Sequence, residues 1–299
     1  MRKILFVLLI NSVLISAQSA GNSGMAFLKF GFSARNVAMG DLGVVSAGDP
    51  IAAYYNPALV TGGSHSRLMF THSSLIQDIS NQNLAANFEM FGLPFMLGVN
   101  TTSIPGIEIR TEPGEPLSTF DANYFFGSIS TGINIVPNIS AGATVKFLYE
   151  NLFSDEASGI GFDFGLLFSD IVDGVNLGAS LRNIGSMSKL RELETKLPVD
   201  LRIGASYDRN FPSLFSDITI EAGYQKYTDT DDSHIHMGTE ILYRGTLALR
   251  TGYITGYDSK GLTAGLGLTW GILNFDYAYV PFEYGLGNIH TISLIYNFL

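Results

Sequence analysis

Apolar and polar residues alternate along most of the chain after about residue 64, and turn-forming residues separate the alternating segments. A period of two is that of a β-strand with two different faces, because successive side chains point to opposite sides of a sheet. We predict fourteen strands from this pattern. Their expected bounds are 66–75, 82–91, 94–104, 120–132, 138–150, 158–169, 174–183, 197–208, 216–226, 234–243, 246–255, 261–270, 272–281 and 288–299.

The strand expected at 197–208 illustrates the two faces. Val199 and Leu201 point one way, whereas Asp200 and Arg202 point the other. An arginine that faces lipid at the middle of a bilayer costs about 2–4 kcal/mol. If the strands cross a membrane, the apolar face must therefore be the outer one, and the charged face lines a lumen.

Short and long connections alternate through most of the strand series. Tight turns such as 92–94 and 244–245 alternate with longer polar segments such as 105–119 and 184–196. Outer-membrane barrels show this asymmetry, with tight periplasmic turns and longer external loops, whereas a soluble β-sandwich has no need of it. The predicted fold class is all-β: a 14-stranded antiparallel transmembrane β-barrel in the outer membrane of a Gram-negative bacterium, with both termini in the periplasm.

The last segment of the chain is itself an apolar strand. An unpaired apolar edge strand invites aggregation, and closure of a barrel removes that edge. We expect this strand to pair with the first one. Its apolar face also resembles the C-terminal signal that the barrel-assembly machinery recognises, although Leu299 follows the terminal aromatic residue. The residues expected to form this signal are Ile292, Leu294, Tyr296 and Phe298.

The first residues read as a secretory signal peptide. Arg2 and Lys3 precede an apolar run at 4–15, and small residues follow. We place the signal peptide at 1–17 or 1–20. No other stretch approaches the ~20 apolar residues of a transmembrane helix, so a membrane location requires strands.

Composition agrees with a barrel and excludes one class of partner. The chain has 33 Gly, 14 Tyr and 21 Phe, with 15% charged residues and no Cys. Without Arg2 and Lys3 the basic count falls from 17 to 15 against 27 acidic residues, a net charge of −12. Nucleic acid is not an expected partner, because backbone binding needs clustered Lys and Arg. Outer-membrane lipid is.

Charged residues on the inward faces of several strands are expected to form a lumenal layer. Structural ion pairing within a plugged barrel is the simpler reading, and a selectivity or docking site for a charged ligand is the alternative. In this layer we expect Glu221 to pair with Arg202 or Arg250. The layer consists of Lys146, Asp163, Arg202, Glu221, Glu240 and Arg250.

Residues 21–64 do not read as strands. Gly24 to Met39 shows patches of helical spacing, and glycines and Pro50 then interrupt it. An apolar segment of this length ahead of a barrel must be buried, and the lumen is the available place. We expect a partly helical plug.

This segment resembles the N-terminal block of the PorV/PorQ family. The resemblance covers residues 27–60 and the series AR–AMG–G–D–A–YNPA. It is carried by Arg35, Met39, Gly40, Asp49, Asn56, Pro57 and Ala58. It implies a FadL-like barrel, since the family shares its fold with long-chain fatty-acid transporters and their hatch. It also implies a role beside the type IX secretion translocon, with binding of cargo C-terminal domains.

No enzyme signature is present. The sequence lacks G-x-S-x-G and H-E-x-x-H, and no catalytic, cofactor-binding or metal-binding residue is predicted. His234 and His236 lie on one strand face near Asp229, Asp231 and Asp232, so a metal site or an Asp/His protease is conceivable. A solvated acidic loop is the commoner origin of such a pattern.

Two functions from different classes remain. The first is a non-enzymatic PorV-like component or cargo-binding shuttle of type IX secretion. The second is a FadL-like transporter of a hydrophobic small molecule such as a long-chain fatty acid. A purely structural outer-membrane role is a third possibility.

Overall fold

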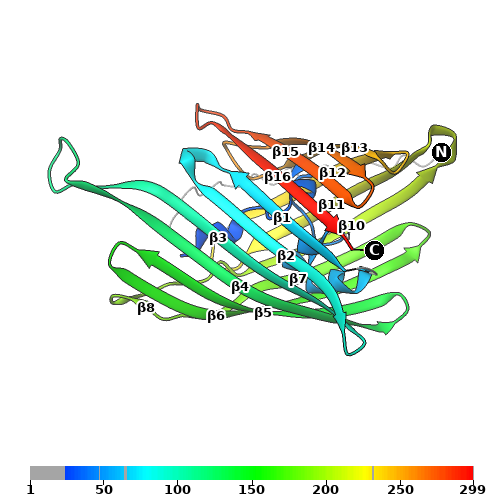
Figure 1. Ribbon diagram of the computed structural model, residues 1–299, viewed down its shortest axis with the longest axis horizontal. Coiled ribbons are helices and arrows are strands. Elements are labelled where there is room, and N and C mark those ends of the chain that lie inside the picture. Colours follow the sequence, from blue (N-terminus) through cyan, green and yellow to red (C-terminus); the bar gives the residue numbers. More distant parts are fainter. Residues whose placement is uncertain (1–23, 47, 64–65, 231, 299) are drawn as a thin grey trace, which may run out of the picture.

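The computed structural model describes residues 24–46, 48–63, 66–230 and 232–298. Fourteen antiparallel strands close into one barrel, in which every strand pairs with its neighbours in sequence and β1 pairs with β16 (Figure 1). The barrel strands are β1 (Arg67–Ser74), β2 (Ser80–Met90), β3 (Leu93–Ile109), β4 (Ser118–Val136), β5 (Ile139–Leu152), β6 (Asp155–Val172), β7 (Val175–Met187), β10 (Asp200–Phe211), β11 (Ser216–Tyr227), β12 (Ser233–Tyr243), β13 (Leu247–Ile254), β14 (Leu262–Trp270), β15 (Leu273–Pro281) and β16 (Asn288–Asn297).

The strands form because each has an apolar outer face and a polar or small inner face. On β10, for example, Ile203 is 49% exposed although it is apolar, while Arg202 is 1% exposed. This inverted burial is stable only where hydrocarbon surrounds the barrel. The pair of strands that closes the barrel has the same apolar outer face. Phe70 on β1 lies opposite Leu294 on β16, and both side chains are exposed on the outer face.

The connections define two ends of the barrel. At the short-turn end, turns such as 91–92 and 173–174 join successive strands, and at the long-loop end lie segments such as 110–117 and 255–261. The C-terminal end of β16 lies at the short-turn end (Figure 1). Two short helices, η4 (Ile76–Asp78) and η5 (Pro212–Leu214), lie in connections.

Two connections, at 151–157 between the strands expected at 138–150 and 158–169 and at 184–196, contain more strand than expected. The β5–β6 connection is a turn of two residues, because Leu152 pairs with Asp155 and strand pairing continues almost to the tip. The 184–196 segment, expected to be irregular, begins with the end of β7 and contains a small hairpin of β8 (Lys189–Leu190) and β9 (Leu193–Glu194).

One side of the barrel is taller than the other. β3, β4 and β6 have 17, 19 and 18 residues, whereas β13, β14 and β15 have 8 or 9. About 9–11 residues suffice to cross a membrane, so the long strands extend beyond it. The β3–β4 hairpin projects past the other connections at the long-loop end (Figure 1).

The described residues between 24 and 62 lie inside the barrel. They form η1 (Ala26–Lys29), α1 (Ala34–Ala38), η2 (Pro50–Tyr54) and η3 (Pro57–Gly62), which we call the plug together with the residues between them. The barrel encloses this segment, drawn in blue in Figure 1. Among the described residues, no helix is both long enough and apolar enough to cross a membrane.

Inward-facing glycines let the plug lie directly on the barrel wall. A Cβ at Gly165 would stand 1.8 Å from Asn56 Oδ1, and one at Gly252 would stand 2.2 Å from Gly40 N. No larger residue fits at such positions without moving the plug. The inward glycines that contact the plug in this way are Gly98, Gly132, Gly142, Gly165, Gly178, Gly204, Gly223, Gly238, Gly252 and Gly265.

Gly40→Ala is expected to lower the free energy of unfolding by about 1–3 kcal/mol, because Gly40 combines a left-handed backbone with a tight wall contact. Its φ is +80°, and a Cβ would stand 2.6 Å from the carbonyl oxygen of Met237. Gly245→Ala is the matched control, since Gly245 has φ +63° but open space around it. Urea unfolding followed by the fluorescence of Trp270, the single tryptophan, measures both. Equal decreases in the free energy of unfolding of the two variants would show that the contact of Gly40 with the wall does not contribute to stability.

Candidate functional site

The plug is held at its C-terminal half by Asn56. Its Nδ2 donates to the carbonyl oxygens of Val44 (2.7 Å) and Leu166 (3.0 Å), and its Oδ1 accepts from Ala58 N (3.0 Å). Asn56 therefore caps η3, joins two parts of the plug and binds β6. Pro57 occupies the first position of η3, where its missing N–H costs no hydrogen bond. Ala58 is fully buried.

The N-terminal half of the plug is held by charge. Arg35 on α1 donates to both carboxylate oxygens of Glu240 on β12, at 3.0 and 2.9 Å. Asp49 accepts from the Ser33 hydroxyl at 2.5 Å, so it ties the start of η2 to the start of α1. Met39 is fully buried, and its carbonyl oxygen would lie 2.3 Å from a Cβ at Gly238. Asp49 thus acts within the plug, and the other resemblance residues contact the wall.

The lumenal charges form separate groups rather than one layer. In the first, Arg250 bridges Glu240 and Asp276 at 2.5 Å each, and Arg35 adds the plug to this group. In the second, Lys146 on β5 lies 2.7 Å from Asp163 on β6.

The third group is centred on Asp200. Its carboxylate accepts from Arg182 at 2.7 and 2.5 Å, from Gln225 at 2.6 Å and from Arg202 at 3.3 Å. Arg182 also donates to the carbonyl oxygen of Tyr54, and Arg202 donates to that of Leu42, so the group binds the plug backbone. Asp200 was not among the residues predicted for the charge layer. Asp200 and Arg202 are two residues apart on the same strand and therefore face the same side, and this spacing could have predicted Asp200 as a member of the layer.

The expected pairing of Glu221 with Arg202 or Arg250 is wrong. The Glu221 carboxylate accepts from the Ser46 hydroxyl of the plug, and Arg202 and Arg250 bind other carboxylates. The physical reason is register: Glu221 lies opposite Ser206, four residues along β10 from Arg202.

Among the described residues, the buried charged side chains of the barrel occupy one part of the wall only. On β16 and β1–β4, the buried polar side chains of the described residues are neutral, and many bond to one another. Asn100 on β3, for example, donates to Asn81 and Asn83 on β2. We call the inner face of β16 and β1–β4 the neutral wall.

A continuous apolar cluster lies between the plug and the barrel, mainly along the neutral wall. Its wall members come from β16, β1–β7 and the segment before β10. Five aromatic rings at its centre, which we call the aromatic barrier, pack with centroids 5.1–6.1 Å apart. They belong to Phe27, Phe32, Tyr54, Tyr124 and Phe126.

A cavity of about 1150 Å³ opens at the long-loop end. We call it the rim cup. Ile109, Phe120, Phe153 and Leu190 give it apolar surface, and charged residues such as Arg191 surround them. Leu190 also packs against the apolar cluster, so the cup leads into it.

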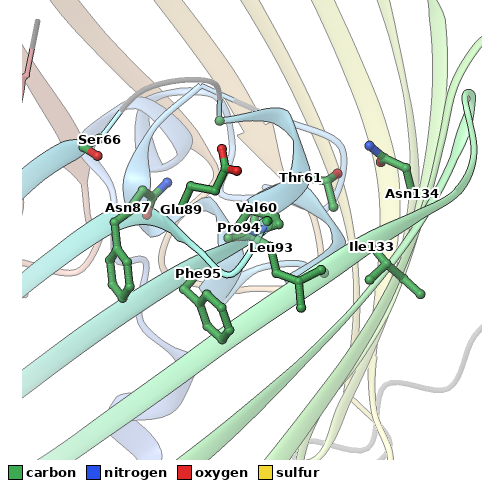
Figure 2. Close-up of a pocket in the computed structure, with 14 residues that line it drawn as sticks. Val60, Thr61, Ser66, Asn87, Glu89, Leu93, Pro94, Phe95, Ile133 and Asn134 are labelled. Atoms are coloured by element: carbon green, nitrogen blue, oxygen red, sulfur yellow. The ribbon is translucent and has the colours of Figure 1, made fainter.

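A second cavity, of about 560 Å³, lies at the opposite end, and we call it the short-turn pocket (Figure 2). It lies between η3 and the ends of β2, β3 and β4. Asn87 and Glu89 extend toward the plug, whereas Phe95 and Ile133 point away from it (Figure 2). Val60 lines this pocket and is also a member of the apolar cluster. The cluster therefore connects the two cavities, neither of which the sequence predicted.

The two histidines noted in the sequence take structural contacts. His234 stacks on Tyr257 with ring centroids 4.0 Å apart, and His236 makes contacts to Gly40 O (2.6 Å) and Gln225 Oε1 (3.1 Å). Asp231 lies outside the described residues. Within the part of the chain that is described, no group of three or more His, Cys, Asp or Glu could hold a metal ion.

Neither a protein-family model nor a curated protein matches the chain. Several solved structures are similar to it. The toluene transporter TodX of Pseudomonas putida is similar at a TM-score of 0.63 and 14% identity, over 89% of this chain and 96% of that one. The monoaromatic hydrocarbon channel CymD is similar at 0.63 and 12%, over 90% and 98%. A FadL homologue of Pseudomonas aeruginosa is similar at 0.53 and 12%, over 89% and 98%. At these identities the likeness shows the fold, which is that of FadL-like outer-membrane barrels.

Proposed function

We propose that this protein is a non-enzymatic transporter that passes small hydrophobic molecules across the outer membrane. The long-loop end would face the exterior and the short-turn end the periplasm, where both termini would lie. The similar structures that are named as hydrocarbon transporters or channels support this class over the alternatives.

The observation that carries the proposal is the apolar connection between the two cavities. Transfer of a hydrophobic molecule from water into an apolar cup is favourable by about 25 cal/mol per Å² of apolar surface buried. From Leu190 in the cup to Val60 in the pocket it would meet apolar side chains. A charged molecule would be disfavoured on the same path, because burial of an unpaired charge is costly.

The path is filled rather than open. Phe126 and Tyr54 are 0% and 1% exposed, so a permeating molecule has to displace or replace ring contacts. While the rings move, the plug would be kept in place by its contacts with the charged side of the wall, which Arg35, Arg182 and Arg202 form. The proposed barrel thus admits apolar molecules and excludes water-filled conduction.

Uptake by cells tests this function. Cells whose outer leaflet is lipopolysaccharide are needed, because a plain phospholipid bilayer passes apolar molecules unaided. Expression of the protein should raise the uptake rate of a labelled monoaromatic hydrocarbon and leave that of a disaccharide of similar mass unchanged. Equal stimulation of both solutes, or of neither, would contradict the proposal.

Type IX secretion is a second candidate function, and the resemblance over residues 27–60 favours it. In this reading the projecting β3–β4 hairpin, with Glu108, Glu112 and Glu115 at its end, would bind a translocon or cargo C-terminal domains. Affinity purification from native membranes distinguishes this function from transport. Recovery of a large translocon or of secreted proteins would support secretion, and recovery of the barrel alone would count against it.

The processing and insertion signals remain proposals as well. The signal peptide at 1–17 or 1–20 lies outside the described residues. Ile292, Leu294, Tyr296 and Phe298 all lie on the outer face, 40–48% exposed. That position suits an insertion signal that the barrel-assembly machinery reads before closure.

A further inference from the structure

The short-turn pocket contains a buried hydrogen-bond acceptor that the apolar path does not require. Asn87 on β2 is 8% exposed, and its Oδ1 has no hydrogen-bond partner among the described residues. An unpaired buried acceptor is costly, and native proteins leave few of them. A ligand that brings a donor to this oxygen would remove the cost.

Glu89 gives the same pocket a negative charge. It lies two residues after Asn87, so both side chains are on the lumenal face of β2. Figure 2 shows both directed toward the plug. The Glu89 carboxylate offers further acceptors, and it repels an anion that enters the pocket. The Arg67 guanidinium beside Gly63 opposes this effect only in part, because it is engaged by the carbonyl oxygen of Gly48 at 2.9 Å.

Two of the other polar lining groups already form hydrogen bonds within the protein. The Thr61 hydroxyl donates to the Ala58 carbonyl oxygen at 2.8 Å, and Asn134 Oδ1 accepts from Ser140 at 2.7 Å. Val60 and Pro94 supply apolar contact area. The volume of about 560 Å³ lies within the range of small-molecule pockets.

We propose that the short-turn pocket is a binding site for small uncharged apolar molecules that carry a hydroxyl group, that is, alcohols or phenols. The hydroxyl donates to Asn87 Oδ1, and the apolar body packs on Val60 and Pro94. Carboxylates of the same size are rejected by Glu89. The inference rests on the proposed function in one respect: arrival along the apolar cluster selects uncharged molecules.

Binding to the full chain in lipid nanodiscs tests the site, with empty nanodiscs subtracted. Benzyl alcohol, toluene and benzoate are the probes, measured by ligand-observed NMR. Asn87→Leu keeps the branched shape of the side chain and removes the acceptor. It should weaken benzyl alcohol binding about three- to tenfold, the effect of one lost hydrogen bond, and leave toluene unchanged. Asn210→Leu, at an exposed position on β10, is the matched control.

Glu89→Gln gives an independent readout should Asn87→Leu fail to fold. It should raise the affinity for benzoate about threefold or more, with benzyl alcohol little changed. Benzyl alcohol binding that is insensitive to Asn87→Leu, or benzoate binding that is insensitive to Glu89→Gln, would overturn the proposal. Failure of the proposed function is distinguishable: cells would then show no hydrocarbon uptake while Asn87-dependent binding in nanodiscs persisted.

Discussion

Asp200→Asn is expected to lower the free energy of unfolding by about 3–5 kcal/mol, because it leaves two buried guanidinium groups without their carboxylate. Arg182 and Arg202 are each 1% exposed, and Asp200 is 0% exposed. Both arginines also donate to plug carbonyl oxygens, so the plug should become more accessible to protease as the barrel weakens. Heat-dependent gel mobility and limited proteolysis measure the two effects.

Asp173→Asn is the control for this variant. Asp173 forms an ion pair of 2.9 Å with Arg209, but the two side chains are 88% and 49% exposed. Surface pairs of this kind contribute about 0–1 kcal/mol. If Asp200→Asn destabilises the barrel no more than Asp173→Asn does, the group around Asp200 does not fasten the plug.

Phe126→Ala is expected to raise hydrocarbon uptake about tenfold or more. Its ring packs on those of Phe27, Phe32 and Tyr54 with centroids 6.1, 5.9 and 5.1 Å away. Each such aromatic contact is worth about 0.5–1.5 kcal/mol, and a barrier lowered by about 1.4 kcal/mol speeds passage tenfold. The same substitution should cost about 3–5 kcal/mol of stability, as for other buried Phe residues. Uptake has to be normalised to folded protein for this reason.

The matched control is Phe164→Ala. Phe164 is on β6 and 51% exposed on the outer face, so its loss removes a ring of the same size without touching the aromatic barrier. Uptake should stay at the level of the unaltered protein. A rise in both variants would indicate general leakage, and a rise in neither would remove the aromatic barrier from the path.

The strands could be predicted because their signal is local. A period of two and turn residues such as Gly92 and Gly245 are visible without tertiary information, and the fourteen strands and their closure are confirmed. Strand ends were less predictable. Pairing of Ile109 with Ser118 extends β3 and β4 past the expected bounds, since a hydrogen-bonded partner outweighs a weak local pattern.

The charge pairs could be predicted only in part. The alternation of apolar and polar residues correctly placed Arg202 and Glu221 on the inward face. The carboxylate that each arginine binds, however, depends on the strand register and on the plug. Ser46 and Asp41, which meet Glu221 and Arg202, come from a segment without periodicity. Spacing along the strands carries no information about such contacts.

The cavities were not predictable at all. The rim cup brings together Ile109, Leu152 and Leu190, which are far apart in sequence. The inward glycines were a missed signal, because ten strands carry one where the plug approaches. A belt of inward glycines in a barrel sequence indicates a backbone that lies against the wall.

The location of a heavy-atom-labelled apolar ligand tests the central claim most directly. Crystals of the protein soaked with bromobenzene should give anomalous peaks in the rim cup and in the short-turn pocket, both beside the strands β2–β6. In Phe126→Ala a further peak should appear in the space vacated by the ring. Peaks confined to the lipid-facing surface, or to the charged wall around Asp200 and Glu240, would contradict an apolar path along the neutral wall.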